Sequence, residues 1–185
     1  MLEEMGVIRK ITPINKENDK KKTFYYLGDF FLNFYYRYLF RNASSLAMMD
    51  HEQFYDAFIR DDLEKEYLTK AFEEITRQYL LWKNKEGYFN PPFIKIGKYW
   101  YDDPITKTNG EFDVVALNTK HEYLFMECKY TKEPLTKSDI EEEMKQVNGL
   151  HVRSPLYGFC SKSGYELLEE DKKSLTLITL ADLYE

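Results

Sequence analysis

The sequence has 185 residues, a formal net charge of −6 and an aromatic fraction of 17%. The length allows one sizeable domain, and no apolar run is long enough to span a bilayer. The N-terminus lacks the pattern of a signal peptide, and two cysteines are too few for a disulfide scaffold, so we expect free thiols and a cytoplasmic protein. The negative charge argues against avid non-specific binding to duplex nucleic acid, but clustered acids can still hold the metal ions of a nuclease.

The N-terminal segment predicts the second half of a winged helix. Residues 2–5 resemble the end of a helix closed by Gly6, and strands are expected at residues 7–11 and 23–27. The polar loop between the strands, residues 15–22, is rich in lysine. We interpret this loop as a solvated hairpin tip rather than as a wing that touches nucleic acid, because charge runs are usually solvated and no recognition helix precedes it. A half winged helix exposes apolar surface, so homo-oligomerisation is also expected.

Two helical stretches follow. Asp29 is a suitable N-cap for a helix with a broad aromatic face, which we interpret as a brace between the hairpin and the main domain rather than as a base-stacking platform. Residues 41–45 break the pattern and predict a loop. A longer helix is expected at residues 63–82, where apolar residues recur every four positions. This helix carries Glu73, whose structural interpretation is an exposed ion pair with Arg77.

The stretch from 110 to 130 predicts a β-hairpin that carries the candidate site, because two apolar runs flank a polar turn. Side chains two residues apart on a strand share a face, so Asp113 is predicted on the face of Val115, and Glu127 on the face of Lys129. Antiparallel pairing would then bring Asp113 beside Glu127 and Lys129. Charged groups at the end of apolar strands are costly unless they are paired or bind a metal, which favours function for these three residues as a set.

A structural interpretation is also open for this region. Glu127 and Lys129 could form a simple ion pair on an edge strand, which contributes little energy. Taken individually, Glu73 and Glu111 are also better explained as surface charges. Cys128 faces the opposite way from its two neighbours and is expected in the core.

The remaining elements alternate between strands and helices. The pattern predicts a strand at 93–101, a polar turn at 102–109, a helix capped by Thr136 or Ser138 and ending near Asn148, a strand at 156–160, a turn at 161–164, a short helix at 165–169 and a strand at 174–180. This order is typical of an α/β or α+β fold with a mixed sheet flanked by helices.

With these residues in view, the sequence resembles the PD-(D/E)XK nuclease superfamily. Its restriction-endonuclease-like core carries a Glu on a helix, an Asp on the second of three strands and Glu-x-Lys on the third. The matching residues are Glu73, Asp113 and Glu127-Cys128-Lys129. The resemblance implies that Glu73, Asp113, Glu127 and Lys129 are catalytic. It also implies that Asp113, Glu127 and the backbone carbonyl of Cys128 bind Mg²⁺ or Mn²⁺.

Two further positions follow from the same resemblance. Lys145 or Gln146 could fill the accessory position often seen on the next helix. Arg77 and Lys98 are expected to touch the substrate backbone.

Short segments elsewhere narrow the resemblance. They look like the C-terminal portion of a family of prokaryotic AAA-type P-loop ATPases, in which an ATPase module and a winged helix precede a nuclease-like domain; these segments are residues 6–8, 26–30, 34–37, 72–73 and 161–165. The sequence contains no G-x-x-x-x-G-K-[ST], so it cannot bind nucleotide through a P-loop of its own. The ATPase module is therefore an implied partner, and the chain is expected to be a fragment or the product of a truncated gene.

We therefore expect a partial winged-helix hairpin at 1–28, a helical connector at 29–60 and a PD-(D/E)XK nuclease-like domain at 61–185. The implied function is metal-dependent hydrolysis of phosphodiester bonds in nucleic acid, and DNA is favoured over RNA as the substrate. No membrane partner is expected. One alternative is a catalytically silent accessory, regulatory or docking domain of the ATPase. A more distant alternative is a module that binds a peptide or toxin partner through the aromatic helix.

Overall fold

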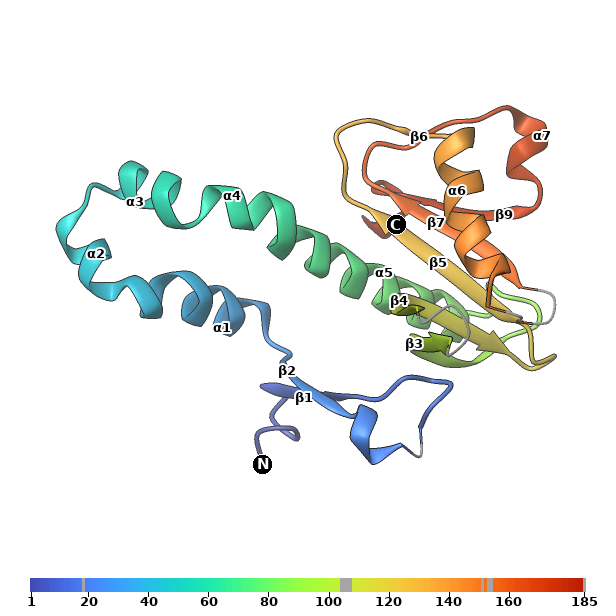
Figure 1. Ribbon diagram of the computed structural model, residues 1–185, viewed down its shortest axis with the longest axis horizontal. Helices are drawn as coiled ribbons and strands as arrows, with labels where there is room; N and C mark the ends of the chain where they lie inside the picture. Colours follow the sequence, from blue (N-terminus) through green and yellow to red (C-terminus); the bar gives the residue numbers. More distant parts are fainter. Residues whose placement is uncertain (18, 104–107, 151, 153–154, 185) are drawn as a thin grey trace.

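The centre of the fold is a five-stranded mixed sheet. It is seen in a computed structural model that describes residues 1–17, 19–103, 108–150, 152 and 155–184. The strand order is β3-β4-β5-β7-β9 (Figure 1), with bounds Phe93–Asp103, Thr108–Asn118, Tyr123–Lys129, Leu156–Ser161 and Leu175–Thr179. The first three strands are antiparallel, and β7 and β9 run parallel to β5. The predicted mixed sheet is confirmed, while residues 104–107 of the expected polar turn at 102–109 lie outside the described residues.

The hairpin of β4 and β5 forms as its sequence predicts. Its pairs run from Leu117 opposite Tyr123 to Val114 opposite Met126. The Asn118 side chain closes the polar turn, because its Oδ1 accepts hydrogen bonds from the backbone N–H groups of Lys120 at 2.9 Å and Glu122 at 3.0 Å. A polar side chain that satisfies turn amides in this way fixes where each strand begins and ends.

One long helix covers each face of the sheet. Helix α5 (Leu68–Lys85) buries Phe72 and Leu80 against residues of β4, β5, β7 and β9. Helix α6 (Lys137–Asn148) packs Ile140 and Val147 on the opposite face, beneath which Phe159 and Phe125 lie. Thr136 caps α6, as predicted, in a reciprocal capping box with Asp139.

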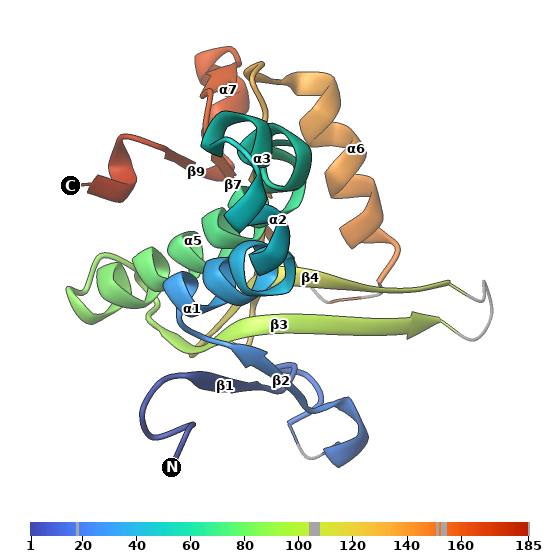
Figure 2. The same ribbon diagram turned by 90° about the vertical axis from the view of Figure 1, so that its left-hand side faces the viewer.

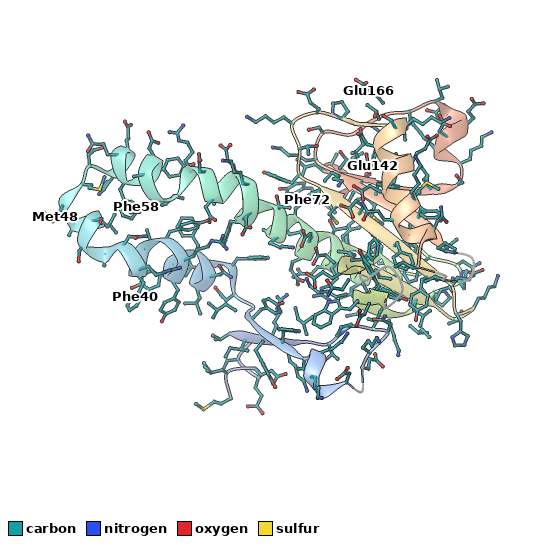
Figure 3. The ribbon with its side chains drawn as sticks, in the orientation of Figure 1. Phe40, Met48, Phe58, Phe72, Glu142 and Glu166 are labelled. Atoms are coloured by element: carbon teal, nitrogen blue, oxygen red, sulfur yellow. The ribbon has the colours of Figure 1, made fainter. Side chains whose placement is uncertain are left out.

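A helical arm projects from the sheet domain (Figure 1). One side runs through α1 (Phe30–Phe34), a π-helical turn (Tyr35–Leu39), a 3₁₀ turn (Phe40–Asn42) and α2 (Ala43–Met48); the other runs through α3 (His51–Phe58), α4 (Arg60–Asp62) and a π-helical turn (Leu63–Tyr67) into α5. Met48 lies near the tip (Figure 3). The helix predicted at 63–82 is thus present, with further helical turns at both ends.

The arm corrects two expectations. Residues 41–45 are helical rather than a loop, because the Asn42 amide donates to the Tyr38 carbonyl at 2.8 Å and the helical turns continue past it. The aromatic face is not a brace to the hairpin. Its Tyr38 and Phe34 pack inside the arm against Phe54 and Ile59 of the returning side, and the rest of the face is exposed, namely Phe30, Phe31 and Tyr35. The predicted N-cap is confirmed, since Asp29 accepts from the Leu32 backbone N–H at 2.8 Å.

The N-terminal hairpin lies beside the outer edge of β3 (Figure 2). It pairs β1 (Ile8–Ile11) with β2 (Phe24–Leu27), as predicted, and a short 3₁₀ turn at Lys20–Lys22 sits in the connecting loop. All four side chains of β2 are exposed. Arg9 forms an ion pair with Glu74 of α5, which holds the hairpin to the sheet domain.

The last segment differs from its prediction. Residues 165–169 are not a helix: Tyr165–Glu166 form strand β8, which pairs parallel with β6 (Leu135–Thr136), and helix α7 spans Glu169–Lys172. The Tyr165 hydroxyl lies 2.7 Å from the Phe159 carbonyl oxygen and 2.6 Å from that of Ile178, and these partly buried contacts outweigh helix propensity. A final 3₁₀ turn spans Asp182–Tyr184. Among the described helices, none combines the length and the apolar character needed to cross a membrane.

Candidate active site

The candidate site lies where β4 and β5 stop pairing. Their last paired residues are Val114 and Met126. Beyond this point β4 pairs only with β3, and β5 pairs only with β7, so the sheet forks. Asp113 and Glu127 are the first residues past the fork. A cavity of about 280 Å³ lies there, lined by Glu73, Glu111, Phe112, Asp113, Met126, Glu127, Cys128, Lys129, Glu143 and Gln146. The structure therefore brings all four predicted catalytic residues to one cavity.

A β-bulge in β4 sets the direction of Asp113. Gly97 of β3 is opposite Val115 and Tyr99 is opposite Phe112, so three steps along β4 match two along β3. Val115 accordingly packs on the α6 face with Phe112. Asp113 instead contacts α5, where the Lys70 ammonium lies 3.2 Å from its Oδ2. The prediction that Asp113 shares a face with Val115 is wrong, because the extra residue of a bulge interrupts the alternation of side chains.

Two lysines hold the Asp113 carboxylate. Lys98 of β3 donates to Asp113 and, at 3.0 Å, to Glu111. Lys70 bridges Asp113 and Glu73, with 3.1 Å to Glu73 Oε2. Burial works to raise the pKa of Asp113, but the two ammonium groups outweigh it and hold the pKa below its usual value. Asp113 is therefore a carboxylate at neutral pH.

Glu73 has the opposite electrostatic environment. Its side chain is 14% exposed and lies next to Asp113. Burial and the Asp113 carboxylate raise the pKa of Glu73 to about 7, against the opposing effect of Lys70. A carboxyl group with a pKa near neutrality can both take up and release a proton under physiological conditions. Neighbouring carboxyls with pKa values moved in opposite directions are typical of acid–base sites.

The second wall of the cavity comes from β5 and α6. The Lys129 ammonium lies 3.0 Å from Glu127 Oε1 and 2.6 Å from Glu143 Oε1. Burial raises the pKa of Glu127, although Lys129 partly offsets this effect. Burial also works to lower the pKa of Lys129, but Glu143 and Glu127 outweigh it and raise the pKa. Lys129 is thus a fixed cation between two carboxylates.

Cys128 lies on the other face of β5, as predicted. It is buried under α5 directly in register with Cys160 of β7, and both thiols are free. Burial raises the pKa of both thiols, so neither is a ready nucleophile. The side chain of Cys128 is therefore structural, although the residue lines the cavity.

Sequence reasoning missed two side chains and misassigned others. Lys70 and Glu143 contact residues of the predicted site, but the sequence analysis did not identify them. Lys70 lies three positions before Glu73 on its helix, and Glu143 lies three positions before Gln146. Helical residues three apart are neighbours, so this spacing could have revealed both. Of the two accessory candidates, Gln146 lines the cavity and donates to Glu143 at 3.2 Å, whereas Lys145 is not among the lining residues.

The two residues expected to touch the substrate backbone are engaged elsewhere. Arg77 pairs with Glu74, at 2.8 and 2.7 Å, rather than with Glu73. Lys98 binds Glu111 and Asp113. The predicted ion pair of Glu73 is instead formed by Lys70, because residues three apart on a helix are neighbours as readily as residues four apart.

The donor set of the cavity suits a hard divalent cation. Five carboxylates line it, from Glu73, Glu111, Asp113, Glu127 and Glu143, and oxygen ligands are those that Mg²⁺ and Mn²⁺ prefer. Three lysines contact these five groups, so negative charge is in excess. Within the described ranges, no three His, Cys, Asp or Glu side chains are already grouped to hold a metal ion. The chemistry of the site therefore fits a cation, and binding one requires the carboxylates to move toward it.

Comparison with known proteins places the chain in a family. Residues 35–146 match the model of a family described as archaeal and bacterial proteins of unknown function (DUF234). An uncharacterized protein of Methanocaldococcus jannaschii is 32% identical over 158 residues, which cover 84% of this chain and 32% of the relative. The chain thus spans about a third of the length of this curated relative. No solved structure matches the chain. The family match covers more than half of the sequence, and the chain belongs to this family of archaeal and bacterial proteins of unknown function.

Proposed function

We propose that this domain is a metal-dependent nuclease of the PD-(D/E)XK type that hydrolyses phosphodiester bonds of nucleic acid, with DNA rather than RNA as its substrate. One observation carries the proposal. The fork between β4 and β5 brings Asp113, Glu127 and Lys129 to one cavity with Glu73 of α5. These four positions are the ones that the resemblance to the superfamily selects. Three separate elements supply them, so their convergence is a property of the fold and not of local sequence.

Each residue has a role that follows from its surroundings. Asp113, Glu127 and the Cys128 carbonyl would hold Mg²⁺ or Mn²⁺, which supplies Lewis acidity to a bound water and to the phosphate. Lys129 is held at the cavity wall, where its ammonium orients the attacking water or donates to a phosphate oxygen. Glu73, with its pKa of about 7, accepts a proton from the water.

The larger context is part of the proposal. The curated relative contains about twice as much additional chain as the region it shares with this sequence, which leaves room for further domains. We propose that in such longer proteins the domain follows a P-loop ATPase module and a winged helix, and that it works in the cytoplasm. The ATPase would then deliver nucleic acid to the cavity.

Metal titration combined with a cleavage assay tests the proposal. Mn²⁺ is titrated by calorimetry into the wild type, Asp113→Asn, Glu127→Gln and Lys129→Met, and plasmid and single-stranded DNA are then supplied. Both carboxylate variants should lose Mn²⁺ binding and cleavage, because one acidic ligand rarely holds such an ion against its hydration shell. Lys129→Met should keep the metal and lose cleavage. Glu166→Gln, at an exposed position of β8 that does not line the cavity, serves as the control (Figure 3).

A second candidate is a catalytically silent docking domain of the ATPase. It is favoured by the lysines that already neutralise Asp113 and by the lack of a ready three-ligand group in the part of the chain that the structure describes. The same experiment separates the two functions. Equal Mn²⁺ binding by the wild type and Asp113→Asn would remove the metal site from this cavity, and the silent domain would then be the better explanation.

A further inference from the structure

The loop between β1 and β2 is held firmly along the outer edge of β3. The Ile14 backbone N–H donates to the Lys98 carbonyl at 2.8 Å. The Asn15 side chain makes two hydrogen bonds with the Trp100 backbone, donating to its carbonyl at 2.7 Å and accepting from its N–H at 3.2 Å. Ile14 is 8% exposed and packs in the core with Val115. Three hydrogen bonds and the buried Ile14 side chain therefore hold the beginning of the loop against β3.

This attachment places the loop close to the cavity. Trp100 is directly opposite Glu111 in the β3–β4 ladder, and Glu111 lines the cavity. The residue that Ile14 binds, Lys98, extends its ammonium to Asp113. Neighbouring strands are about 5 Å apart, so the loop begins about 10 Å from the strand that carries Asp113. Nucleotides repeat about every 3.4 Å along one strand of a duplex, so the gap corresponds to about three of them.

The loop carries positive charge that is not neutralised locally. Of its two carboxylates, Glu17 pairs with Lys95 at 2.7 Å, and Asp19 accepts a hydrogen bond from the Lys21 backbone N–H at 3.0 Å and keeps its negative charge within the loop. The lysines of the loop outnumber these two carboxylates. The ammonium groups of Lys16 and Lys21 are exposed and form no ion pair with the residues that the structure describes. The ammonium group of Lys22 lies 6.0 Å from the centre of the Trp100 ring.

The cavity shows the contrary pattern. Each of Lys70, Lys98 and Lys129 is already paired with a carboxylate, so most of their positive charge is compensated within the cavity. A nucleic acid strand that reaches this acidic cavity therefore needs cations outside it. The loop between β1 and β2 is attached next to the cavity, and its Lys16 and Lys21 pair with no carboxylate in the described part of the chain.

We propose that Lys16, Lys21 and Lys22, here called the lysine loop, bind the phosphate backbone of the nucleic acid strand whose scissile bond enters the cavity. This inference rests on the proposed function and adds the surface that holds the substrate. It changes the interpretation of the loop from a solvated hairpin tip to an electrostatic clamp. The reason is the attachment of its base to Trp100 and Lys98, which the sequence does not reveal.

Fluorescence anisotropy tests the lysine loop without using catalysis. Fluorescein-labelled single-stranded DNA and the matched duplex are titrated in EDTA over a range of salt concentrations. Each duplex phosphate contact contributes about 0.9 to the salt slope, and each single-strand contact about 0.7. The triple variant Lys16→Gln/Lys21→Gln/Lys22→Gln should therefore lose roughly 2 to 3 units of slope and at least about tenfold in affinity at low salt.

A matched control changes the same net charge elsewhere. Lys85, Lys120 and Lys173 are exposed, lie away from the loop in sequence and form no ion pair in the described part of the chain. Their triple Gln variant should bind as the wild type does. If the two triple variants lose equal DNA affinity and salt dependence, the lysine loop is not the binding surface. Wild-type binding that does not depend on salt would also contradict the proposal.

The same proteins separate this inference from the proposed function. If the wild type cleaves DNA with Mn²⁺ and the loop variant binds and cleaves DNA equally well, the proposal that the lysine loop binds DNA is wrong, and the proposal that the domain is a nuclease is supported. If the wild type binds DNA through the loop but neither binds Mn²⁺ nor cleaves, the nuclease is wrong and the loop remains a nucleic acid site.

Discussion

Lys129 lies closer to Glu143 of α6, at 2.6 Å, than to Glu127 of its own strand, at 3.0 Å. The lysine of the Glu-x-Lys pattern is therefore positioned from across the cavity, by the helix that follows it in the chain. Gln146 hydrogen-bonds to the other oxygen of Glu143 at 3.2 Å and completes this arrangement. The position of the ammonium group thus depends on the docking of α6 as much as on the strand.

The first prediction concerns this contact. Glu143→Gln should lower the pKa of Lys129, because Glu143 raises it and burial then acts with less opposition. NMR titration of the lysine Nζ resonances would measure the change. Glu141→Gln, at an exposed position on the same helix, should leave the Lys129 pKa unchanged. An unaltered titration in Glu143→Gln would show that Glu143 does not control the lysine.

The second prediction concerns pH and the attachment of the N-terminal hairpin. Burial works to raise the pKa of Glu74, but Arg77, Gln78 and Arg9 outweigh it and lower the pKa. A carboxyl group whose pKa is lower in the folded than in the unfolded protein stabilises the fold at pH values above its unfolded pKa of about 4.3. This stabilisation is lost as the pH falls through the folded-state pKa. Glu74→Gln should therefore reduce the free energy of unfolding by about 1–3 kcal/mol at neutral pH.

Urea unfolding at a series of pH values would measure this difference. The wild type and Glu74→Gln should converge in stability at a pH below both pKa values, because the wild-type carboxyl is then protonated in both states. Glu64→Gln, at an exposed position of the helical arm, controls for the loss of one charge. A stability difference that persists at acid pH would contradict the assignment to this ion pair.

The third prediction compares two apolar residues of α5. Leu80 is fully buried against the sheet, whereas Ile75 is 42% exposed. Leu80→Ala should cost about 2–5 kcal/mol of unfolding free energy, because it leaves a cavity in a packed core. Ile75→Ala should cost less than about 1 kcal/mol, since much of its side chain is already in water. Similar losses in the two variants would show that α5 does not pack as described.

The fourth prediction concerns the exposed apolar surface around β2 and α1. Tyr25 is 63% exposed and Phe31 is 74% exposed, and their neighbours Phe24, Tyr26, Leu27 and Phe30 are also exposed. A two-stranded hairpin is marginally stable alone, and such patches tend to bind partners. We expect the chain to self-associate, and Tyr25→Ser/Phe31→Ser to weaken this association in analytical ultracentrifugation. A monomeric wild type at all concentrations would refute this expectation.

Much of the sheet and its helices could be predicted from local patterns. The hairpin of β4 and β5 has two apolar runs around a polar turn, and Asn118 closes that turn through its own side chain. Asp29 precedes an aromatic helix and caps it. In these cases a few adjacent residues decide the structure, so their sequence is sufficient.

Other features depend on contacts between distant residues. The bulge in β4 could not be predicted from Asp113 and Val114 themselves. It is defined by the register with β3, in which Gly97 lies opposite Val115 and Tyr99 lies opposite Phe112. The extended conformation of Tyr165 depends on carbonyl groups of two other strands. The partners of the candidate site, Lys70 and Glu143, become neighbours of Asp113 and Lys129 only after both helices have docked.

The fork has a mechanical consequence for the distance between its two carboxylates. No hydrogen-bonded ladder joins β4 to β5 at Asp113 and Glu127. On its outer side, β5 pairs with β7 at Glu127, and β4 pairs with β3 on both sides of the bulge at Asp113. The gap between the carboxylates is therefore set by the angle between two separately supported strand pairs. A small rotation of one pair against the other widens or narrows that gap without breaking a backbone hydrogen bond of the sheet. Under the proposed function, this freedom would let the site adjust its width to an ion or a phosphate while the core beneath it stays packed.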